Sequence, residues 1–302
     1  MKMAICKFIR SGADQAYRER ICRQIAILGE DGQRKMASTK LTFVGCGGNG
    51  SAVILLCALA GFRSMYLVDG DRLEIHNLNR FALGGVRDVG KHKVFVVKRS
   101  LHRLFPGMRV VAFPKAIQSD GVWERAKVCH WLIDATDSDE TRHFLQKKCV
   151  EDGVPLVSLA SGFMTHDNKM VSAGCRVNRV RPNDACLECQ VLDEEPMQHA
   201  QVSLVVPNMI AAALALDMLL REITGYAKSV LSDERAGIHT AAETDVPAPD
   251  DANFVMFDLF ARTLIAQRVV PSPHCPLCGR INGAPQKGRS FARTTNLERN
   301  ER

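Results

Sequence analysis

A glycine-rich loop stands between an apolar run and an amphipathic segment, and this arrangement can hold phosphate groups. Its residues are Gly45-Cys46-Gly47-Gly48-Asn49-Gly50. Glycine permits the tight turn and lets a ligand approach the backbone, and the first amides of the following helix attract anions. Asp69 stands 24 residues after Gly45, where an acidic side chain accepts hydrogen bonds from a ribose. The pattern predicts a nucleotide site, lined by Gly45, Gly47, Gly48 and Gly50, for either a dinucleotide or ATP; the alternative is a glycine-rich turn without a ligand.

A polar and cationic segment follows Asp69. It contains Asp71, Asn77 and Arg80, and Lys93 stands near the start of the next expected helix. Asn77 can donate to phosphate oxygens, and the planar guanidinium of Arg80 can grip them. A triphosphate-handling enzyme needs such a cluster, whereas a dehydrogenase does not. The alternative is a charged surface loop that binds nothing.

Two cysteine pairs have the spacing of zinc knuckles. They are Cys186-Leu187-Glu188-Cys189 and Cys275-Pro276-Leu277-Cys278. Zinc takes four thiolates in a tetrahedron, and a two-residue spacer lets one turn present two of them. The sequence therefore predicts one closed, structural Zn²⁺ site that joins the late part of the chain to its middle. Disulfides or free thiols are the alternative.

Asp137 is a candidate ligand for Mg²⁺. It follows the apolar run Trp131–Ile133, and ligands of open α/β sheets bind beyond the carboxyl ends of the strands. Magnesium prefers one or two carboxylates together with phosphate and water oxygens. The alternative is a helix cap, a role that suits Asp134 or Ser138 better.

Apolar runs that alternate with helical patterns must position these residues. The expected strands are 41–44, 64–68, 109–113, 131–133 and 154–159, and the expected helices are 13–35, 51–60, 89–104 and 138–150. Such alternation predicts a Rossmann-like α/β fold with a mostly parallel sheet and helices on both faces. Later strands at 170–177, 254–257 and 263–268, with an apolar helix at 209–220, are expected to continue the sheet in antiparallel fashion.

The expected organisation is an N-terminal helical arm, one large domain and a tail. The arm covers residues 1–36, and the domain covers 37–279, with a nucleotide-binding half at 37–160 and a partner-binding and zinc half at 161–279. Composition rich in Asp, Pro and Ala predicts a mobile insertion at about 226–252. The polar, basic residues 280–302 are expected to be disordered.

Composition favours a soluble, cytoplasmic protein. The chain has 302 residues, 46% of them hydrophobic and 24% charged, and no apolar run approaches the ~20 residues of a membrane helix. The first ten residues are too mixed for a secretory signal. Eleven cysteines, four of them paired by spacing, fit a reducing compartment better than a disulfide framework. The net charge of +7 and the basic tail leave nucleic-acid binding as an alternative to a solvated tail.

The order of the motifs resembles the ThiF/MoeB/HesA family, bacterial relatives of ubiquitin-activating enzymes. The matching motifs are Asp-x-Asp-x-x-x-x-x-Asn-Leu-x-Arg at 69–80, Val-Gly-x-x-Lys at 89–93, the segments 22–25, 29–33 and 134–137, and the cysteine pairs. The resemblance covers roughly Arg20 to Gly279 and implies an ATP- and Mg²⁺-dependent adenylyltransferase. It implies that the glycine loop and Asp71 lie at the nucleotide, that Asp69 holds the ribose, that Asn77, Arg80 and Lys93 contact phosphates, and that Asp137 binds Mg²⁺. It also implies that Arg23 reaches the neighbouring subunit's site, which requires a homodimer.

The resemblance implies that a carboxylate, usually the C-terminal glycine of a ubiquitin-like or sulfur-carrier protein, becomes an acyl-adenylate. Many relatives then capture the acyl group on a cysteine, but residues 191–206 contain none, and the expected position falls near His199. Cys149 and Cys175 lie in predicted regular elements and are expected to be structural. Phe81 and Ser138 depart from the residues that the family often has at these positions.

The absent cysteine leaves alternatives open. The chain either stops at the adenylate, passes the acyl group to a partner or uses another of its cysteines, or it adenylates a peptide or a tRNA-bound carboxylate. A non-catalytic nucleotide-binding partner of a small carrier protein is a further alternative, and an NAD oxidoreductase ranks last. One chain does not name the substrate.

Overall fold

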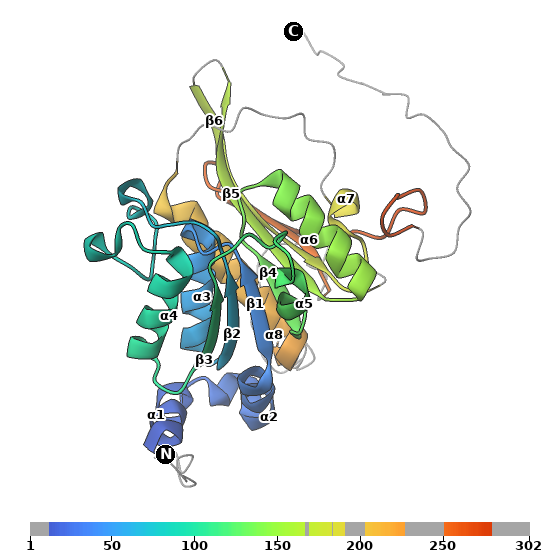
Figure 1. Cartoon of the computed structure of the whole chain (residues 1–302). Helices are drawn as coiled ribbons and strands as arrows, with labels where there is room; N and C mark the ends of the chain where they lie inside the picture. The colour runs from blue at the N-terminus through green and yellow to red at the C-terminus, as the bar shows by residue number, and fades with distance from the viewer. Residues whose placement is uncertain (1–11, 167–168, 183, 191–202, 227–250, 280–302) are drawn as a thin grey trace.

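The strands form one mixed sheet of eight. The computed structural model describes residues 12–166, 169–182, 184–190, 203–226 and 251–279 (Figure 1). The strand order is β3-β2-β1-β4-β5-β6-β7-β8, with β1 to β5 parallel and β6 to β8 antiparallel. The strands are β1 Lys40–Val44, β2 Ser64–Val68, β3 Arg109–Phe113, β4 Trp131–Asp134, β5 Leu156–His166, β6 Lys169–Val180, β7 Phe254–Asp258 and β8 Thr263–Gln267.

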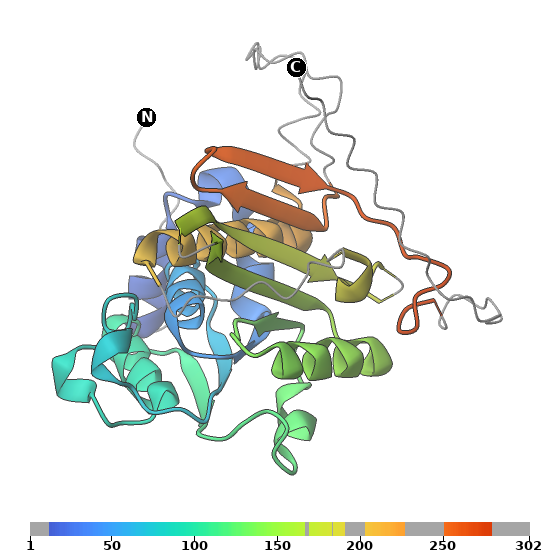
Figure 2. The same cartoon turned by 90° about the horizontal axis from the view of Figure 1, so that it is seen from above.

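Helices cover both faces of this sheet, as the sequence predicts. They are α1 Gly12–Ile21, α2 Ile25–Ser38, α3 Gly48–Ala60, α4 Lys93–Leu104, α5 Val122–Ala126, α6 Asp139–Asp152, α7 Leu187–Gln190 and α8 Val205–Thr224, with short 3-10 turns η1 Ile75–Asn77 and η2 Val86–Asp88. Figure 2 shows α6 and α8 on opposite sides of β5 and β6. Among the described residues, no helix has both the length and the apolar character needed to cross a bilayer.

The alternation of side chains along the strands divides the core into two layers. In β1, Leu41 and Phe43 pack with α3, α4 and α8, whereas Val44 packs with α5 and α6. In β4, Ile133 and Leu132 divide in the same way. Both faces of the central strands are therefore buried, which explains why these strands appear in the sequence as continuous apolar runs.

Some predicted boundaries differ from the observed elements. The single helix expected at 13–35 is two helices, α1 and α2, separated by a turn at residues 22–24, and α2 itself contains Gly29 at φ 70°. The helix expected from Val89 begins at Lys93, because Gly90 takes φ 86° and ends the preceding turn. Helix α5 was not predicted. Strands β5 and β6 are longer than predicted and pair with each other beyond the end of β4.

The described part of the chain resumes at Asp251, near the C-terminal end of the insertion predicted at about 226–252. Residues 227–250 lie outside the described part of the chain, as does the predicted tail at 280–302. Asp251, by contrast, accepts a hydrogen bond from buried Arg179 at 2.6 Å. Asn253 is fully buried and pairs through its side chain with the backbone of Val269. These two residues belong to the folded domain.

Candidate active site

The glycine loop leaves the carboxyl end of β1 and enters α3, as predicted. Gly45 takes φ 88°, and a Cβ there would lie 2.7 Å from the carbonyl oxygen of Ala135. A Cβ at Gly50 would overlap the carbonyl oxygen of Gly45, and one at Gly48 would lie 2.9 Å from Cδ of Arg80. A Cβ at Gly47 would meet nothing within 4 Å. Backbone packing therefore requires glycine at Gly45 and Gly50, a side chain at Gly48 would displace Arg80, and Gly47 faces open space.

Asp69 ties the end of β2 to the glycine loop. Its Oδ2 accepts a hydrogen bond from the Cys46 amide at 2.6 Å, and its Oδ1 accepts one from the Asp71 amide at 2.7 Å. Burial raises the pKa of Asp69, although the two amides and the charge of Lys93 act in the opposite direction. The carboxylate predicted to hold a ribose therefore also fixes the shape of the loop.

Lys93 brings a nearly buried cation to the same edge. Its Nζ lies 2.8 Å from Oδ2 of Asp71. Burial alone would lower the pKa of Lys93, but the hydrogen bond to Asp71 and the charges of Asp69, Asp71 and Asp137 together raise it. Asp137 is exposed, and its effect on Lys93 places these two predicted site residues within electrostatic reach of each other.

Arg80 and Asn77 come from the polar segment after β2. The Nη1 of Arg80 donates to the carbonyl oxygen of His76 at 3.2 Å and to Oδ1 of Asn79 at 3.0 Å, while its aliphatic part lies over Gly48. The Oδ1 of Asn77 accepts from the Glu74 amide at 3.1 Å. Arg80 therefore lies against the glycine loop, and Asn77 is oriented by a local turn.

Arg23 lies at the opposite end of the sheet. It is exposed in the turn between α1 and α2, and Figure 1 shows these helices at the end where β1 begins. The neighbouring Gln24 donates to the carbonyl oxygen of Ala60 at 2.5 Å, at the last residue of α3. A 13-residue helix is about 20 Å long. The structure therefore does not bring Arg23 to the glycine loop of its own chain.

The residues at this edge fit a magnesium nucleotide. Gly47 leaves room beside the backbone, and the first amides of α3 favour an anion there. Lys93 and Arg80 supply positive charge, and the exposed carboxylate of Asp137 is the kind of ligand that Mg²⁺ accepts alongside phosphate oxygens. Ser138, not Asp137, caps α6: its Oγ accepts from the Thr141 amide at 3.2 Å. Asp137 is thus free of the capping role that was its alternative.

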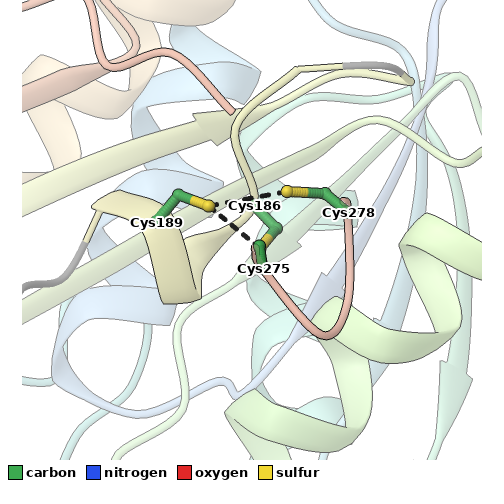
Figure 3. A group of neighbouring side chains, drawn as sticks. All are labelled: Cys186, Cys189, Cys275 and Cys278. Carbon is green, nitrogen blue, oxygen red and sulfur yellow. Dashed lines mark hydrogen bonds between the residues drawn. The ribbon is translucent and has the colours of Figure 1, made fainter. Parts of the chain in front are cut away.

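The two cysteine pairs meet in one cluster, shown in Figure 3. The four sulfur atoms lie within 4.8 Å of one another, and Cys186 and Cys275 are separated by 3.4 Å, Cys189 and Cys278 by 3.5 Å. Tetrahedral zinc with Zn–S bonds of ~2.3 Å needs sulfurs about 3.8 Å apart. The cluster therefore fits a four-thiolate metal site with no position left for a substrate.

Burial raises the pKa of the Cys186 thiol and raises that of Cys189 to about 11, whereas the pKa of Cys275 moves in the opposite direction. Partial burial would raise the pKa of Cys275, but the backbone amides of Cys278 and Leu277, together with the thiols of Cys186 and Cys189, lower it to about 7. Helix α6 packs on the first knuckle, since Glu188 accepts from Gln146 at 2.6 Å. The ten cysteines in the described ranges form no disulfides, and the sulfur separations of 3.4 and 3.5 Å exceed the ~2.05 Å of a disulfide bond.

Neither of the two cysteines that the sequence predicts to be structural is an accessible nucleophile. Cys149 and Cys175 are buried in α6 and β6, as predicted. Burial raises the pKa of both thiols, that of Cys175 to about 11. The predicted position near His199 lies outside the described residues.

The sequence did not point to two polar clusters beside the site. Asn208, in the first turn of α8, donates to Oδ1 of Asn49 at 2.6 Å and to Oγ of Ser161 at 2.8 Å, next to Gly48. Asp134, at the end of β4, is fully buried and is approached by Arg142 from α6. These partners come from separate segments, so no local pattern identifies them.

Comparison with known protein families identifies relatives of this chain. The model of the ThiF family matches residues 21–250. The chain belongs to the ThiF family. This confirms the resemblance identified from the motifs. The relatives include an adenylyltransferase and sulfurtransferase MOCS3-1 of Zea mays, 28% identical over 88% of this chain and 52% of that protein. They also include protein HesA of Leptolyngbya boryana, 26% identical over 88% of this chain and 87% of that protein. The chain spans about half the length of the MOCS3-type relatives.

Solved structures share the fold of this ThiF-family chain. E. coli MccB, crystallised with AMPCPP and MccA, superposes with a TM-score of 0.67 at 21% identity, over 87% of this chain and 76% of MccB. The protein PaaA superposes with a TM-score of 0.64 at 18% identity, over 90% of this chain and 78% of PaaA. The predicted fold class, a mostly parallel sheet continued by antiparallel strands, is confirmed.

Proposed function

We propose that this ThiF-family chain is an ATP-dependent adenylyltransferase that converts a substrate carboxylate into an acyl-adenylate and releases pyrophosphate. One observation carries the proposal. The open glycine loop follows β1, the exposed carboxylate of Asp137 follows β4, and the nearly buried Lys93 pairs with Asp71 just after β2, so all three lie toward the carboxyl ends of these strands. Ligands of open α/β sheets bind at this edge.

The reaction forms one bond and breaks one. A carboxylate oxygen of the substrate attacks the α-phosphorus of ATP, the bond from that phosphorus to the bridging oxygen breaks, and pyrophosphate leaves with the electron pair. Positioning and charge neutralisation dominate such phosphoryl chemistry. In this proposal the glycine loop and Asp69 hold the nucleoside side, while Asn77, Arg80 and Lys93 hold phosphate oxygens, and Asp71 keeps Lys93 in place. Asp137 holds Mg²⁺, which when bound neutralises charge on the phosphates.

The proposed acceptor is the C-terminal glycine of a small ubiquitin-like or sulfur-carrier protein. A relative from Thermus thermophilus, 31% identical over 50% of this chain and 55% of its own length, is named a sulfur carrier protein adenylyltransferase. The proposed assembly is a homodimer, because Arg23 is exposed about 20 Å from its own glycine loop and can serve a site only in a partner copy. The four-cysteine cluster is proposed to hold one structural Zn²⁺.

The second candidate is the same chemistry on a peptide or a tRNA-bound carboxylate. Residues 191–206 contain no cysteine, so an acyl group cannot pass to a thiol there. An enzyme that releases or uses the adenylate directly does not need that thiol.

The test is ATP–pyrophosphate exchange by the purified chain. We expect exchange that depends on Mg²⁺ and on a candidate acceptor, either a small protein ending in glycine or, for the second candidate, a peptide or tRNA. Asp137→Asn should abolish exchange, whereas Asp139→Asn, which removes a neighbouring exposed carboxylate, should retain it. Both variants should keep about one zinc per chain.

Three results would contradict the proposal. ATP binding without exchange for any acceptor class would identify a non-catalytic binding partner. Binding of reduced NAD in place of ATP would identify an oxidoreductase. Wild-type exchange by Asp137→Asn would remove Asp137 from the site.

A further inference from the structure

A fully buried carboxylate lies three residues before the proposed magnesium ligand. Asp134 ends β4 with no exposed surface. Its Oδ1 accepts from the Thr136 amide at 3.0 Å and from the Thr136 hydroxyl at 2.7 Å. Its Oδ2 accepts from the Ser158 hydroxyl of the neighbouring strand β5 at 2.8 Å. These bonds fold the chain after β4 into a defined turn.

Arg142 closes this turn from the side of α6. Its Nε lies 3.4 Å from Oδ2 of Asp134, and its Nη2 donates to the carbonyl oxygen of Thr136 at 2.6 Å. The side chain is only 15% exposed. A third contact, from Nη1 to Asp139 at 3.1 Å, faces outward, because the Asp139 side chain is 83% exposed. The guanidinium is therefore directed at the turn and not at open solvent.

The same turn supports the glycine loop. The Ala135 amide donates to the carbonyl oxygen of Val44 at 2.9 Å, and the backbone of Ala135 leaves Gly45 no room for a Cβ. Residues 135–138 thus contact the start of the glycine loop on one side and carry Asp137 on the other. A shift of this turn would move both parts of the proposed nucleotide site.

We propose that Arg142 is a positioning residue: together with Asp134 it holds the turn 134–138 in the shape that aims Asp137 at Mg²⁺ and seats Gly45. This inference rests on the proposed function for its catalytic consequence. Thr136 and Ser158 are the other members of what we call the Asp134 latch, defined as Asp134, Thr136, Arg142 and Ser158. None of the four needs to touch ATP or metal for the latch to act.

The chemistry of the latch explains its composition. A buried carboxylate is costly unless it is paired and hydrogen-bonded, and Asp134 satisfies both needs through Arg142 and three donors. Arginine suits this place better than lysine, because its planar guanidinium places charge 3.4 Å from the carboxylate while another nitrogen donates to the Thr136 carbonyl. Residues that orient a metal ligand without touching the metal typically change metal affinity 10- to 100-fold when they are replaced.

The experiment compares graded variants of the latch with a control on the same arginine. Arg142→Lys keeps the charge but cannot make both contacts. Thr136→Val removes one hydroxyl donor, and Thr136→Ser restores it. Asp139→Asn removes only the charge from the outward contact of Arg142. If Arg142→Lys does not fold, Thr136→Val and Thr136→Ser, at a half-buried position, decide the question.

Two readouts are measured on the full-length, zinc-loaded chain. The first is the Mg²⁺ concentration that gives half-maximal pyrophosphate exchange, which we expect to rise about tenfold in Arg142→Lys and in Thr136→Val. The second is amide hydrogen exchange of residues 135–138 in ligand-free protein, which we expect to become at least about tenfold faster in those two variants. Thr136→Ser and Asp139→Asn should match the wild type in both.

The two readouts separate this inference from the function on which it rests. If the wild type shows no exchange with any acceptor, the proposed function fails, and hydrogen exchange alone decides whether the latch holds the turn. If the wild type is active and folded Arg142→Lys and Thr136→Val keep the wild-type Mg²⁺ dependence, the positioning role is wrong. A tenfold effect from Asp139→Asn would also overturn it, because the outward contact would then matter as much as the buried one.

Discussion

Alanine substitutions at Gly50 and Gly47 should separate a glycine that the fold needs from a glycine that a ligand needs. At Gly50 the new Cβ would overlap the carbonyl oxygen of Gly45, and neither group can move without distorting the loop. Overpacking of this kind costs about 1–3 kcal/mol, and alanine in the first turn of α3 returns at most about 1 kcal/mol through helix propensity. We therefore expect Gly50→Ala to lower the free energy of unfolding by about 2 kcal/mol.

Gly47→Ala is the matched control for stability and the test for binding. Gly47 has a negative φ of −76°, with ψ −144° just outside the extended region, and a Cβ there meets no protein atom within 4 Å. Glycine is a better N-cap than alanine, so a loss of less than about 1 kcal/mol is expected. The same Cβ would enter the space through which we propose that the nucleotide approaches, so ATP affinity should fall at least about tenfold, or 1.4 kcal/mol.

The assays are urea unfolding without nucleotide and calorimetric titration with a non-hydrolysable ATP analogue, both with zinc present. Equal losses of stability in the two variants would refute the packing argument. Unchanged affinity in Gly47→Ala would refute the placement of the nucleotide at this loop, whatever the stability results.

Four further predictions concern other parts of the molecule. Lys93→Met should weaken ATP-analogue binding at least about tenfold, because it removes the positive charge that lies among the carboxylates of residues 69, 71 and 137. Titration calorimetry would show unchanged affinity if Lys93 merely neutralises Asp71. Arg23→Ala and Asp137→Ala should each lack exchange activity, but a 1:1 mixture of the two variants refolded together should recover about a quarter of wild-type activity. Half of the dimers are then mixed, and each mixed dimer has one complete site out of two. Recovery near zero would argue against a contribution across the dimer. Metal analysis should find about one zinc per chain in the wild type and far less in Cys275→Ser. The control Cys175→Ser, whose thiol lies outside the cluster, should keep its zinc. Equal zinc contents in the two variants would place the metal elsewhere. Partial burial alone would raise the pKa of Asp251, but the hydrogen bond and charge of Arg179, with the charges of Arg181 and Arg268, hold it below its usual value. The resulting stability is present above the unfolded pKa of about 3.9 and is lost as the pH falls through the lower folded value. Asp251→Asn should therefore be less stable than the wild type near neutral pH, the difference should shrink below about pH 4, and a difference that persists there in urea unfolding would contradict the assignment.

The central fold follows from the sequence because both faces of the parallel strands are buried. Leu41, Phe43 and Ile133 pack on one side while Val44 and Leu132 pack on the other, so these strands stand out as apolar runs. The short helix α5 does not stand out, since it is fixed by a distant contact, from Nε1 of Trp123 to Asp152 at 2.7 Å. A five-residue helix has too few internal hydrogen bonds to be predicted from the helix propensity of its residues.

In the candidate site, too, some residues could be predicted from the sequence and others could not. Lys93 and Asp137 are far apart in sequence, and their placement at one edge is a prediction from the rule that parallel strands gather their carboxyl ends there. The placement of Arg23 away from its own glycine loop also agrees with the prediction that it serves a neighbouring subunit, which stays a prediction. Arg142 was not predicted, because its role depends on a hydrogen bond to the Thr136 carbonyl. Every residue has a backbone carbonyl, so such an acceptor cannot be identified from the sequence.

Buried Arg179 escaped prediction for a related reason. It is only 3% exposed and pairs with Glu222 and Asp251. These partners lie 43 and 72 residues away along the chain. Only the tertiary structure brings them together.

The positions of the four cysteines along the chain determine when the cluster can form during synthesis. Its two halves, at 186–189 and 275–278, enclose α8 and the β7–β8 hairpin within the closed loop. During synthesis the nucleotide-binding strands leave the ribosome first and can pair early, whereas the second knuckle emerges only after nearly all of the sheet has been made. If the cluster holds the proposed Zn²⁺, metal uptake is then among the last steps of maturation, and a chain truncated before Cys275 would carry the proposed nucleotide site without this metal site.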